Sequence, residues 1–324
     1  MTLKDIDNIC WFIPFRKLRD SIRELLTDIY KINIGINYVI YNLNNKNNDD
    51  TLVVSISGGF ADQIYYYILS KKIELVYGKK IKYDISWYLE DGFDIEGKNK
   101  RIFELLNVFP ELKLDMAKSE ELLVYKNYFD FIYNYKPYVD DYYFDNVLSS
   151  KKNVYLYNYP CIFRDKYLDI FNNNILPLLD FDRYLFPKLD DVNLKYFNDI
   201  KSEMFSVACH IRRTDYLKVP DIKIPDKIYY KKAIELLSSK LNTNSLKIFF
   251  FSDDIDYVEN ELLPLIGNDF KYEVVRANNS EKGYIDFYLI SLCKYQIASV
   301  GSFCKCAYIF NKFSDKIIIT PDDI

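Results

Sequence analysis

The sequence predicts an α/β protein whose parallel strands are covered by helices on both faces. In the second half of the chain, short apolar runs rich in β-branched and aromatic residues alternate with segments of helical length. Apolar runs of this kind are typical of strands buried in a parallel sheet. The chain has 324 residues, 49% of them hydrophobic. That length allows about two domains of roughly 150 residues each and excludes disordered, collagen-like and disulfide-scaffold classes.

The charge and the scarce histidine exclude several functions. Lys and Arg number 43 against 47 Asp and Glu, a net charge of −4, so the chain lacks the positive field of a protein that coats nucleic acid. His210 is the single histidine, which excludes multi-histidine zinc sites. Cys304 and Cys306 lack further ligands for a metal, and the 6 cysteines are typical of reduced thiols in a cytoplasmic protein. We find no signal peptide and no apolar run of the roughly 18 residues that a membrane span needs.

Residues 1–50 form a separate amino-terminal segment. Apolar residues recur at helical spacing from Trp11 to Leu26, with basic residues close by: Arg16, Lys17, Arg19 and Arg23. One interpretation is a basic amphipathic helix on the cytoplasmic face of an anionic inner membrane, and the other is a helix packed on its own protein. The polar stretch Asn42 to Asp50 is typical of a linker.

The globular body then begins, and its elements follow in order. We predict a strand from Leu52 to Ser57, a helix from Phe60 to about Leu75, a helix from Lys100 to Val108, a strand from Val154 to Tyr157 and a helix from Arg164 to Phe171. Further strands are predicted at 205–209, 246–251, 271–275, 296–299 and 316–319, and further helices at 228–241, 254–263, 283–294 and 303–311. The stretch from Tyr125 to Asn146 has no assigned structure or role.

Polar clusters follow three predicted strands, and ligands of parallel sheets bind beyond the carboxyl ends of strands. Gly58 and Gly59 allow close backbone approach at a helix start. The run H-I-R-R-T-D-Y at 210–216 carries paired arginines, which imply either a dianion such as pyrophosphate or internal carboxylate partners. The run S-D-D at 252–254 could bind a metal, cap a helix or accept hydrogen bonds from a base edge.

Together these motifs resemble the bacterial α-1,2-fucosyltransferases of glycosyltransferase family eleven. The matching stretches are G-G-F-A-D-Q at 58–63, H-I-R-R-T-D-Y at 210–216, Y-Y-K-K-A-I at 229–234, F-F-S-D-D at 250–254 and D-F-Y-L-I-S-L-C-K-Y at 286–295. Two stretches depart from the family pattern. The family's Asn in the first motif is Asp62, and its N-S-S-F-S-W-W is V-G-S-F-C-K-C at 300–306.

The resemblance implies a GT-B-like fold with two Rossmann-like domains that face a cleft. We expect an acceptor domain at 51–203 and a GDP-sugar domain at 204–324. The implied reaction is inverting transfer of L-fucose from GDP-β-L-fucose to a sugar hydroxyl of an oligosaccharide or lipid-linked glycan, without a metal cofactor. Because the 300–306 motif is altered, a transferase for another GDP-sugar remains an alternative. A nucleotide-sugar-binding protein without turnover, which would keep Arg212 and the aspartates, is a second alternative.

The resemblance also implies roles for single residues. Arg212 is expected to bind the β-phosphate and assist departure of GDP. For Arg213 a phosphate contact and internal carboxylate partners stay open, and His210 is expected either to contact the nucleotide or to be a satisfied core imidazole. The remaining donor-site candidates are Gly58, Gly59, Ser252, Asp253 and Asp254, the last two for guanine, and Ser302 with the amide of Phe303 for phosphate oxygens. Asp62 is the first candidate for the general base and Asp215 the second.

Overall fold

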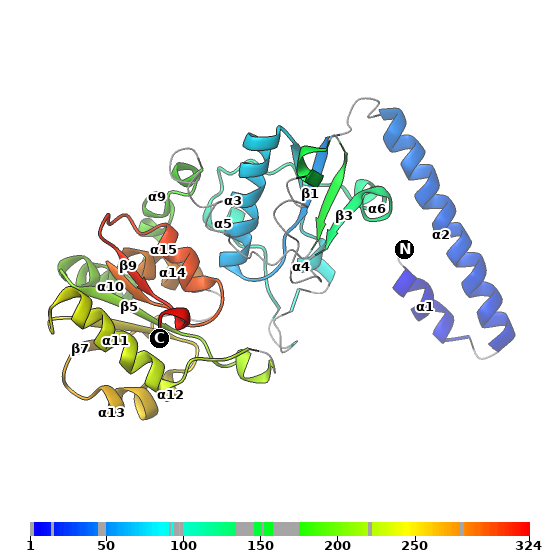
Figure 1. Cartoon of the computed structure of the whole chain (residues 1–324). Coiled ribbons are helices and arrows are strands. Elements are labelled where there is room, and N and C mark those ends of the chain that lie inside the picture. Colours follow the sequence, from blue (N-terminus) through cyan, green and yellow to red (C-terminus); the bar gives the residue numbers. More distant parts are fainter. Residues whose placement is uncertain are drawn as a thin grey trace. The chain divides into compact units, whose positions relative to one another are not determined.

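The structure is a computed structural model that describes residues 3–13, 16–44, 50–90, 92–93, 97, 100–133, 146–150, 152–157, 175–219, 222–278 and 282–324 (Figure 1). Contacts divide the chain into two compact units. The first comprises Met1–Ile56, Ser70–Ser86 and Leu114–Pro160, and the second Ser57–Leu69, Trp87–Lys113 and Cys161–Ile324. Each unit is discontinuous along the chain. Because this division follows contacts rather than chain order, the continuous domains at 51–203 and 204–324 stay a prediction.

The first unit contains a parallel sheet with the strand order β2-β1-β4-β3. Its strands are β1 (Thr51–Ser55), β2 (Lys80–Asp84), β3 (Asp130–Tyr133) and β4 (Val154–Tyr157). Its helices include α1 (Leu3–Trp11), α2 (Arg16–Asn44) and α6 (Ser119–Tyr128), and α3 (Phe60–Tyr77) has residues in both units. Every residue of β1 is buried, as expected for a central strand.

The second unit contains a parallel sheet with the order β7-β6-β5-β8-β9. Its strands are β5 (Ser206–Ile211), β6 (Lys247–Ser252), β7 (Lys271–Val274), β8 (Tyr295–Ile297) and β9 (Ile317–Ile319). The main helices are α9 (Phe181–Leu185), α10 (Asp191–Ser202), α11 (Lys227–Leu241), α14 (Gly283–Leu292) and α15 (Phe303–Ile309). Short helices are α4 (Ser86–Glu90), α5 (Leu105–Val108), α12 (Ile255–Tyr257) and α13 (Leu263–Ile266).

The core of this unit follows from the two-residue period of the strands. Val207, Cys209 and Ile211 lie on one face of β5 and pack in a buried cluster with Ile234 and Leu237 of α11. The intervening residues of β5 are also buried. Because both faces of β5 are covered, its position is fixed, and so is the loop that leaves its carboxyl end.

The prediction of an α/β, GT-B-like fold with two Rossmann-like sheets and an added amino-terminal helical segment is confirmed. Every strand and helix predicted after residue 204 has a counterpart within a few residues. Among the earlier predictions, the helix from Lys100 to Val108 is limited to α5, and the segment from Trp11 to Leu26 lies in two helices rather than one. The predicted linker begins inside α2, at Asn42.

Some predictions fall on parts of the chain outside the described residues. These are the helix from Arg164 to Phe171 and most of the unassigned stretch from Tyr125 to Asn146. Among the described helices, none combines the length and the apolar character needed to cross a bilayer.

Candidate functional site

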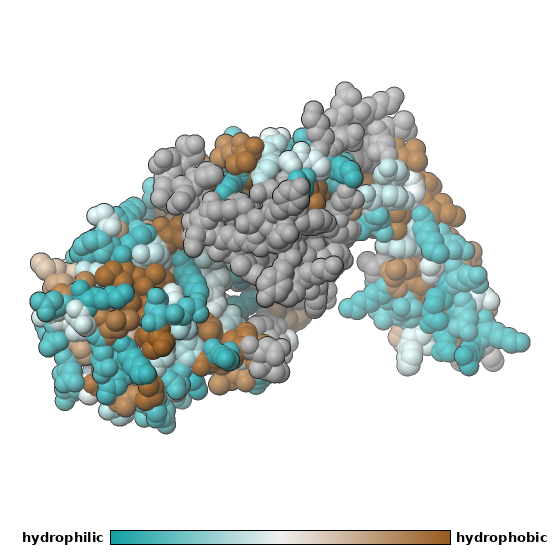
Figure 2. Space-filling model, in the orientation of Figure 1, coloured by the Kyte–Doolittle hydropathy of each residue, from teal (hydrophilic) through white to brown (hydrophobic). Residues whose placement is uncertain are grey.

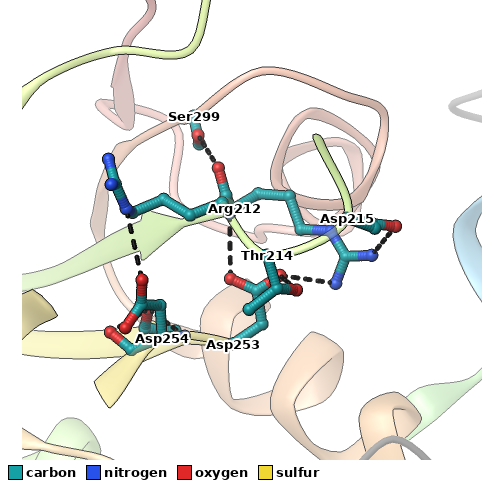
Figure 3. Close-up of polar contacts among 8 residues, drawn as sticks. Arg212, Thr214, Asp215, Asp253, Asp254 and Ser299 are labelled. Atoms are coloured by element: carbon teal, nitrogen blue, oxygen red, sulfur yellow. Dashed lines mark hydrogen bonds and ion pairs between the residues drawn. The ribbon is translucent and has the colours of Figure 1, made fainter. Parts of the chain in front are cut away.

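The arginine motif and the aspartate pair lie side by side because their strands are neighbours. Ile211, the last residue of β5, is paired in parallel register with Ser252, the last residue of β6. Residues 212–213 and 253–254 therefore leave the sheet at the same edge (Figure 3). This is the edge at which parallel sheets bind ligands.

Two carboxylates hold the guanidinium group of Arg212. Its Nη2 donates to Oδ2 of Asp215, and its Nη1 lies 2.9 Å from Oδ2 of Asp253 (Figure 3). The three side chains are 26%, 8% and 19% exposed, respectively, so both pairs are shielded while the arginine still reaches the surface. A guanidinium group carries five N–H donors. The two contacts leave the others for an anion.

Arg213 has an internal carboxylate partner, one of the two alternatives that the sequence left open. Its Nε donates to Oδ2 of Asp254 at 3.3 Å, and its guanidinium carbon lies 3.7 Å from the centroid of the Tyr257 ring. The aromatic face and the carboxylate together stabilise a cation that is largely withdrawn from water.

Both aspartates also shape the loop that carries the arginines. Asp253 accepts hydrogen bonds from the amide of Arg213 at 2.9 Å and from the hydroxyl of Thr214 at 2.7 Å. Asp254 accepts from the amide of Tyr257 at 3.0 Å and thereby caps α12, as the helix-cap interpretation predicts. The hydroxyl of Ser252 accepts from the amide of Asp254 at 2.9 Å. Recognition of guanine by either carboxylate stays a prediction.

Three buried polar atoms around the arginines lack hydrogen-bond partners in the described part of the chain. They are Nδ1 of His210, Oδ1 of Asp215 and the hydroxyl of Tyr257. The ring of His210 stacks on Phe303 at 5.4 Å, and burial, together with the charge of Arg212, lowers the pKa of His210 to about 3. The imidazole is therefore neutral near pH 7. Because an unpaired buried polar atom costs about 1–3 kcal/mol, a ligand that supplies partners here is favoured.

Further side chains contact the arginine loop on the side away from Asp253 and Asp254 (Figure 3). The hydroxyl of Tyr230 donates to Oγ of Ser299 at 3.0 Å, and this Oγ donates to the carbonyl oxygen of Arg212 at 3.4 Å (Figure 3). The hydroxyl of Tyr229 donates to the carbonyl of Ala298 at 2.7 Å. The sequence showed the tyrosine pair as a motif but gave it no role, and it gave no signal for Ser299.

The glycine turn before α3 and the start of α15 are joined through Asp62. Its Oδ2 accepts from the amide of Gly59 at 3.1 Å, and its Oδ1 accepts from the hydroxyl of Ser302 at 2.8 Å. Burial raises the pKa of the Asp62 carboxyl, although both hydrogen bonds oppose that rise. Gly58 has a φ of +84°, and a Cβ there would lie 2.5 Å from Oδ2 of Asp62. This turn therefore requires glycine.

Tyr216 connects the arginine motif to the altered 300–306 motif. Its ring centroid lies 5.6 Å from the guanidinium carbon of Arg212. Gly301 has a φ of +92°, and a Cβ there would lie 2.9 Å from the Tyr216 hydroxyl. The residues predicted at 62, 212, 215 and 302 thus belong to one continuous region of the second unit.

Sequence reasoning missed a second acidic group in this region. Burial raises the pKa of Glu104 to about 7, against the charge of Arg101, which also acts on Asp62. The side chain of Gln63 positions this loop, since its Oε1 accepts from the amides of Glu104 at 2.8 Å and Leu105 at 3.0 Å. Gln63 belongs to the G-G-F-A-D-Q motif at 58–63, but nothing in the sequence connects it to a glutamate 41 residues later.

The described residues include no group of three or more His, Cys, Asp or Glu side chains arranged to hold a metal ion. Cys304 and Cys306 are buried, and burial raises the pKa of the Cys304 thiol to about 12. These cysteines act as core residues. Catalysis without a metal stays a prediction.

Comparisons with known proteins agree with the motifs. Residues 138–322 match the sequence model of the family described as Glycosyl transferase family 11. The chain is 28% identical over 293 residues to the O-antigen biosynthesis glycosyltransferase WbnK of Escherichia coli. The match covers 82% of this chain and 92% of that protein.

Solved structures of similar fold include fucosyltransferase NodZ from Bradyrhizobium, with 13% identity and a TM-score of 0.44 over 80% of this chain and 92% of that one. They also include POFUT1 in complex with GDP, with 12% identity and a TM-score of 0.42 over 85% of this chain and 98% of that one.

Proposed function

We propose the following function for this chain, which belongs to glycosyl transferase family 11. It is an inverting transferase that moves L-fucose from GDP-β-L-fucose to a glycan hydroxyl. The linkage we propose is α-1,2, and the product is part of a surface polysaccharide. The family motifs support the donor. The relative WbnK, described as an O-antigen biosynthesis glycosyltransferase, supports the type of product.

The observation that carries this proposal is the arginine loop at the carboxyl end of the strands in the second sheet. Arg212 is oriented by two carboxylates with donors to spare, and unpaired buried polar atoms of His210, Asp215 and Tyr257 surround the two arginines. A diphosphate with an attached base and sugar offers anionic oxygens to the remaining N–H donors of Arg212 and hydrogen-bonding groups to these unpaired atoms.

In the proposed reaction the acceptor oxygen attacks the anomeric carbon and the bond from that carbon to the β-phosphate oxygen breaks. The electron pair leaves with GDP, and the acceptor proton passes to a general base. Arg212 stabilises the charge that develops on the leaving diphosphate, so that the protein supplies electrostatically what a metal ion supplies in other transferases. Ser302 and the amide of Phe303 are proposed as additional phosphate contacts.

Asp62 is the proposed general base, and its raised pKa suits that role. Both of its oxygens already accept hydrogen bonds, from Gly59 and Ser302. Glu104 therefore competes for the role, since its pKa of about 7 lies where a base is most effective. Asp215 is a weaker candidate because it is paired with Arg212.

The experiment that tests the donor is calorimetry with GDP, GDP-fucose, GDP-mannose and UDP-glucose, each with EDTA, for wild type and Arg212→Ala. We expect GDP-fucose to bind in EDTA and to lose most of its affinity in the variant. A preference for GDP-mannose would retain the site and change the donor. Absence of guanine-nucleotide binding would refute the assignment.

Turnover distinguishes a transferase from a nucleotide-sugar-binding protein. We expect release of GDP from GDP-fucose to accelerate when oligosaccharide or lipid-linked acceptors are added. Release that no acceptor changes would favour the binding protein. Contact of residues 11–26 with the cytoplasmic face of the inner membrane is the alternative to a role of this segment in protein packing, and flotation of full-length and residue-27-onward proteins with anionic vesicles tests it.

A further inference from the structure

Helix α2 has two apolar faces, and the chain itself uses one of them. This face lies against α1 and α6 (Figure 1). Ile34 is 6% exposed there, and the ring of Tyr38 stacks on Tyr128 with the centroids 4.1 Å apart. The first face thus explains why α2 stays attached to the first unit.

The other face carries a row of exposed aliphatic side chains, part of which is visible in brown along α2 in Figure 2. The row, here called the α2 stripe, consists of Leu18, Ile22, Leu25, Ile29, Ile32, Ile36 and Val39. Ile22 is half-buried, and the other six are 48–62% exposed. Single exposed apolar residues are ordinary, but a continuous row over six turns indicates a binding surface.

The spacing along the stripe identifies the kind of partner. Successive members are four and three residues apart in strict alternation, which gives the 3.5-residue period of a two-helix coiled coil. In heptad terms the a positions are Ile22, Ile29 and Ile36, and the d positions are Leu18, Leu25, Ile32 and Val39. Isoleucine at a with leucine at d, as in the first half of the stripe, favours two parallel strands, whereas Ile32 and Val39 at the later d positions also suit three or four strands, so the measured mass has to separate these cases.

The charges near the stripe suit a helix better than an anionic surface. Residues 3–44 contain six basic and five acidic side chains. Several of the cations are already paired: Arg23 lies 2.9 Å from Asp7, and Lys31 lies 3.7 Å from Asp28. In a parallel pair of α2 helices, no two like charges face each other across the seam, since Asp28 at position g meets an asparagine at position e. A lipid surface would gain little electrostatic attraction here.

We propose that the α2 stripe binds the α2 stripe of a second copy of this chain, forming a parallel two-stranded coiled coil. The dimer is symmetric, so each stripe residue packs against its own counterpart and one sequence satisfies both sides of the interface. The inference concerns assembly and does not depend on the proposed donor or acceptor.

The test compares the full-length wild type with Ile29→Glu/Ile36→Glu by analytical ultracentrifugation. We expect twice the monomer mass for wild type and the monomer mass for the variant, because buried carboxylates would face each other at two a positions. The matched control is Lys17→Glu/Lys31→Glu, which changes more charge on exposed positions of the same helix outside the stripe and should stay dimeric. Far-UV circular dichroism and a thermal melt confirm that the variants fold.

A cysteine pair tests the orientation. In the parallel arrangement Leu18→Cys places the new thiols beside each other, so oxidation should join two chains, whereas Asp20→Cys on the opposite side of α2 should not. In an antiparallel pair the two positions would lie about 30 Å apart, at 1.5 Å per residue. A wild-type monomer, a dimer that survives Ile29→Glu/Ile36→Glu, a dimer without the Leu18→Cys cross-link, or a monomer whose stripe binds anionic vesicles would each overturn the proposal.

Discussion

Replacing Arg212 by alanine should weaken GDP binding far more than it weakens the fold. A charge-assisted hydrogen bond contributes about 1.5–3 kcal/mol, so loss of two contacts to a diphosphate amounts to about 3–6 kcal/mol. Since each 1.4 kcal/mol is a factor of about ten, the Kd for GDP should rise at least about 100-fold. Arg212→Lys keeps the charge but not the fork that reaches Asp215 and Asp253 together, so it should fall between wild type and alanine.

The effect on stability is smaller because the arginine is 26% exposed and Asp253 keeps two further donors. We expect a loss of about 2 kcal/mol from leaving the Asp215 carboxylate unpaired, less than the 3–5 kcal/mol of a fully buried pair. At about 2–4 °C per kcal/mol this lowers the Tm by about 4–8 °C.

The assay is titration calorimetry with GDP in EDTA, combined with thermal melts of the same samples. Arg183→Ala is the matched control, because Arg183 pairs with Glu111 at 2.6 Å while both side chains are more than half exposed. Surface pairs contribute about 0–1 kcal/mol, so this variant should bind GDP as wild type does. A folded Arg212→Ala protein with wild-type affinity for GDP would refute the assignment of the site.

Three further outcomes are expected. Gly58→Ala should lower stability by about 1–3 kcal/mol, whereas Gly59→Ala, which meets no atom within 4 Å, should stay closer to wild type in the same thermal melt. Asp62→Ala should abolish turnover with GDP affinity retained. If instead Glu104→Gln does so and removes an activity limb that rises with pH near 7, Glu104 is the base. Because the pKa of His210 is lowered to about 3 in the folded protein, the unfolded chain binds one more proton between pH 3 and about 6.5, and the stability of the fold falls as the pH drops through that range. His210→Gln should lessen this slope by up to about 1.4 kcal/mol per pH unit, measured by urea titrations at several pH values. An unchanged slope would contradict the buried neutral imidazole.

The arginine loop could be placed from the sequence because local signals agree there. A buried strand ends before residue 212, and the next strand ends before residue 253. In a parallel sheet two such ends meet at one edge. Which carboxylate pairs with which arginine could not be read from the sequence, since Arg212 bonds to Asp215 and Asp253, and only strand register brings Asp253 within reach.

From the sequence we could predict the order of strands and helices after residue 204, the amphipathic amino-terminal segment and the strand-end clusters at residues 58–59, 210–216 and 252–254, because each depends on residues close together in the chain. The three-dimensional packing was needed to show that Asp62 bonds to Ser302, that Tyr230 and Ser299 support the arginine loop, and that burial raises the pKa of Glu104 to about 7. It also separated the two faces of α2, one packed and one exposed. These properties depend on which segments, far apart in the sequence, pack around a given side chain and exclude water from it. The hydrophobic periodicity of the sequence does not specify that packing.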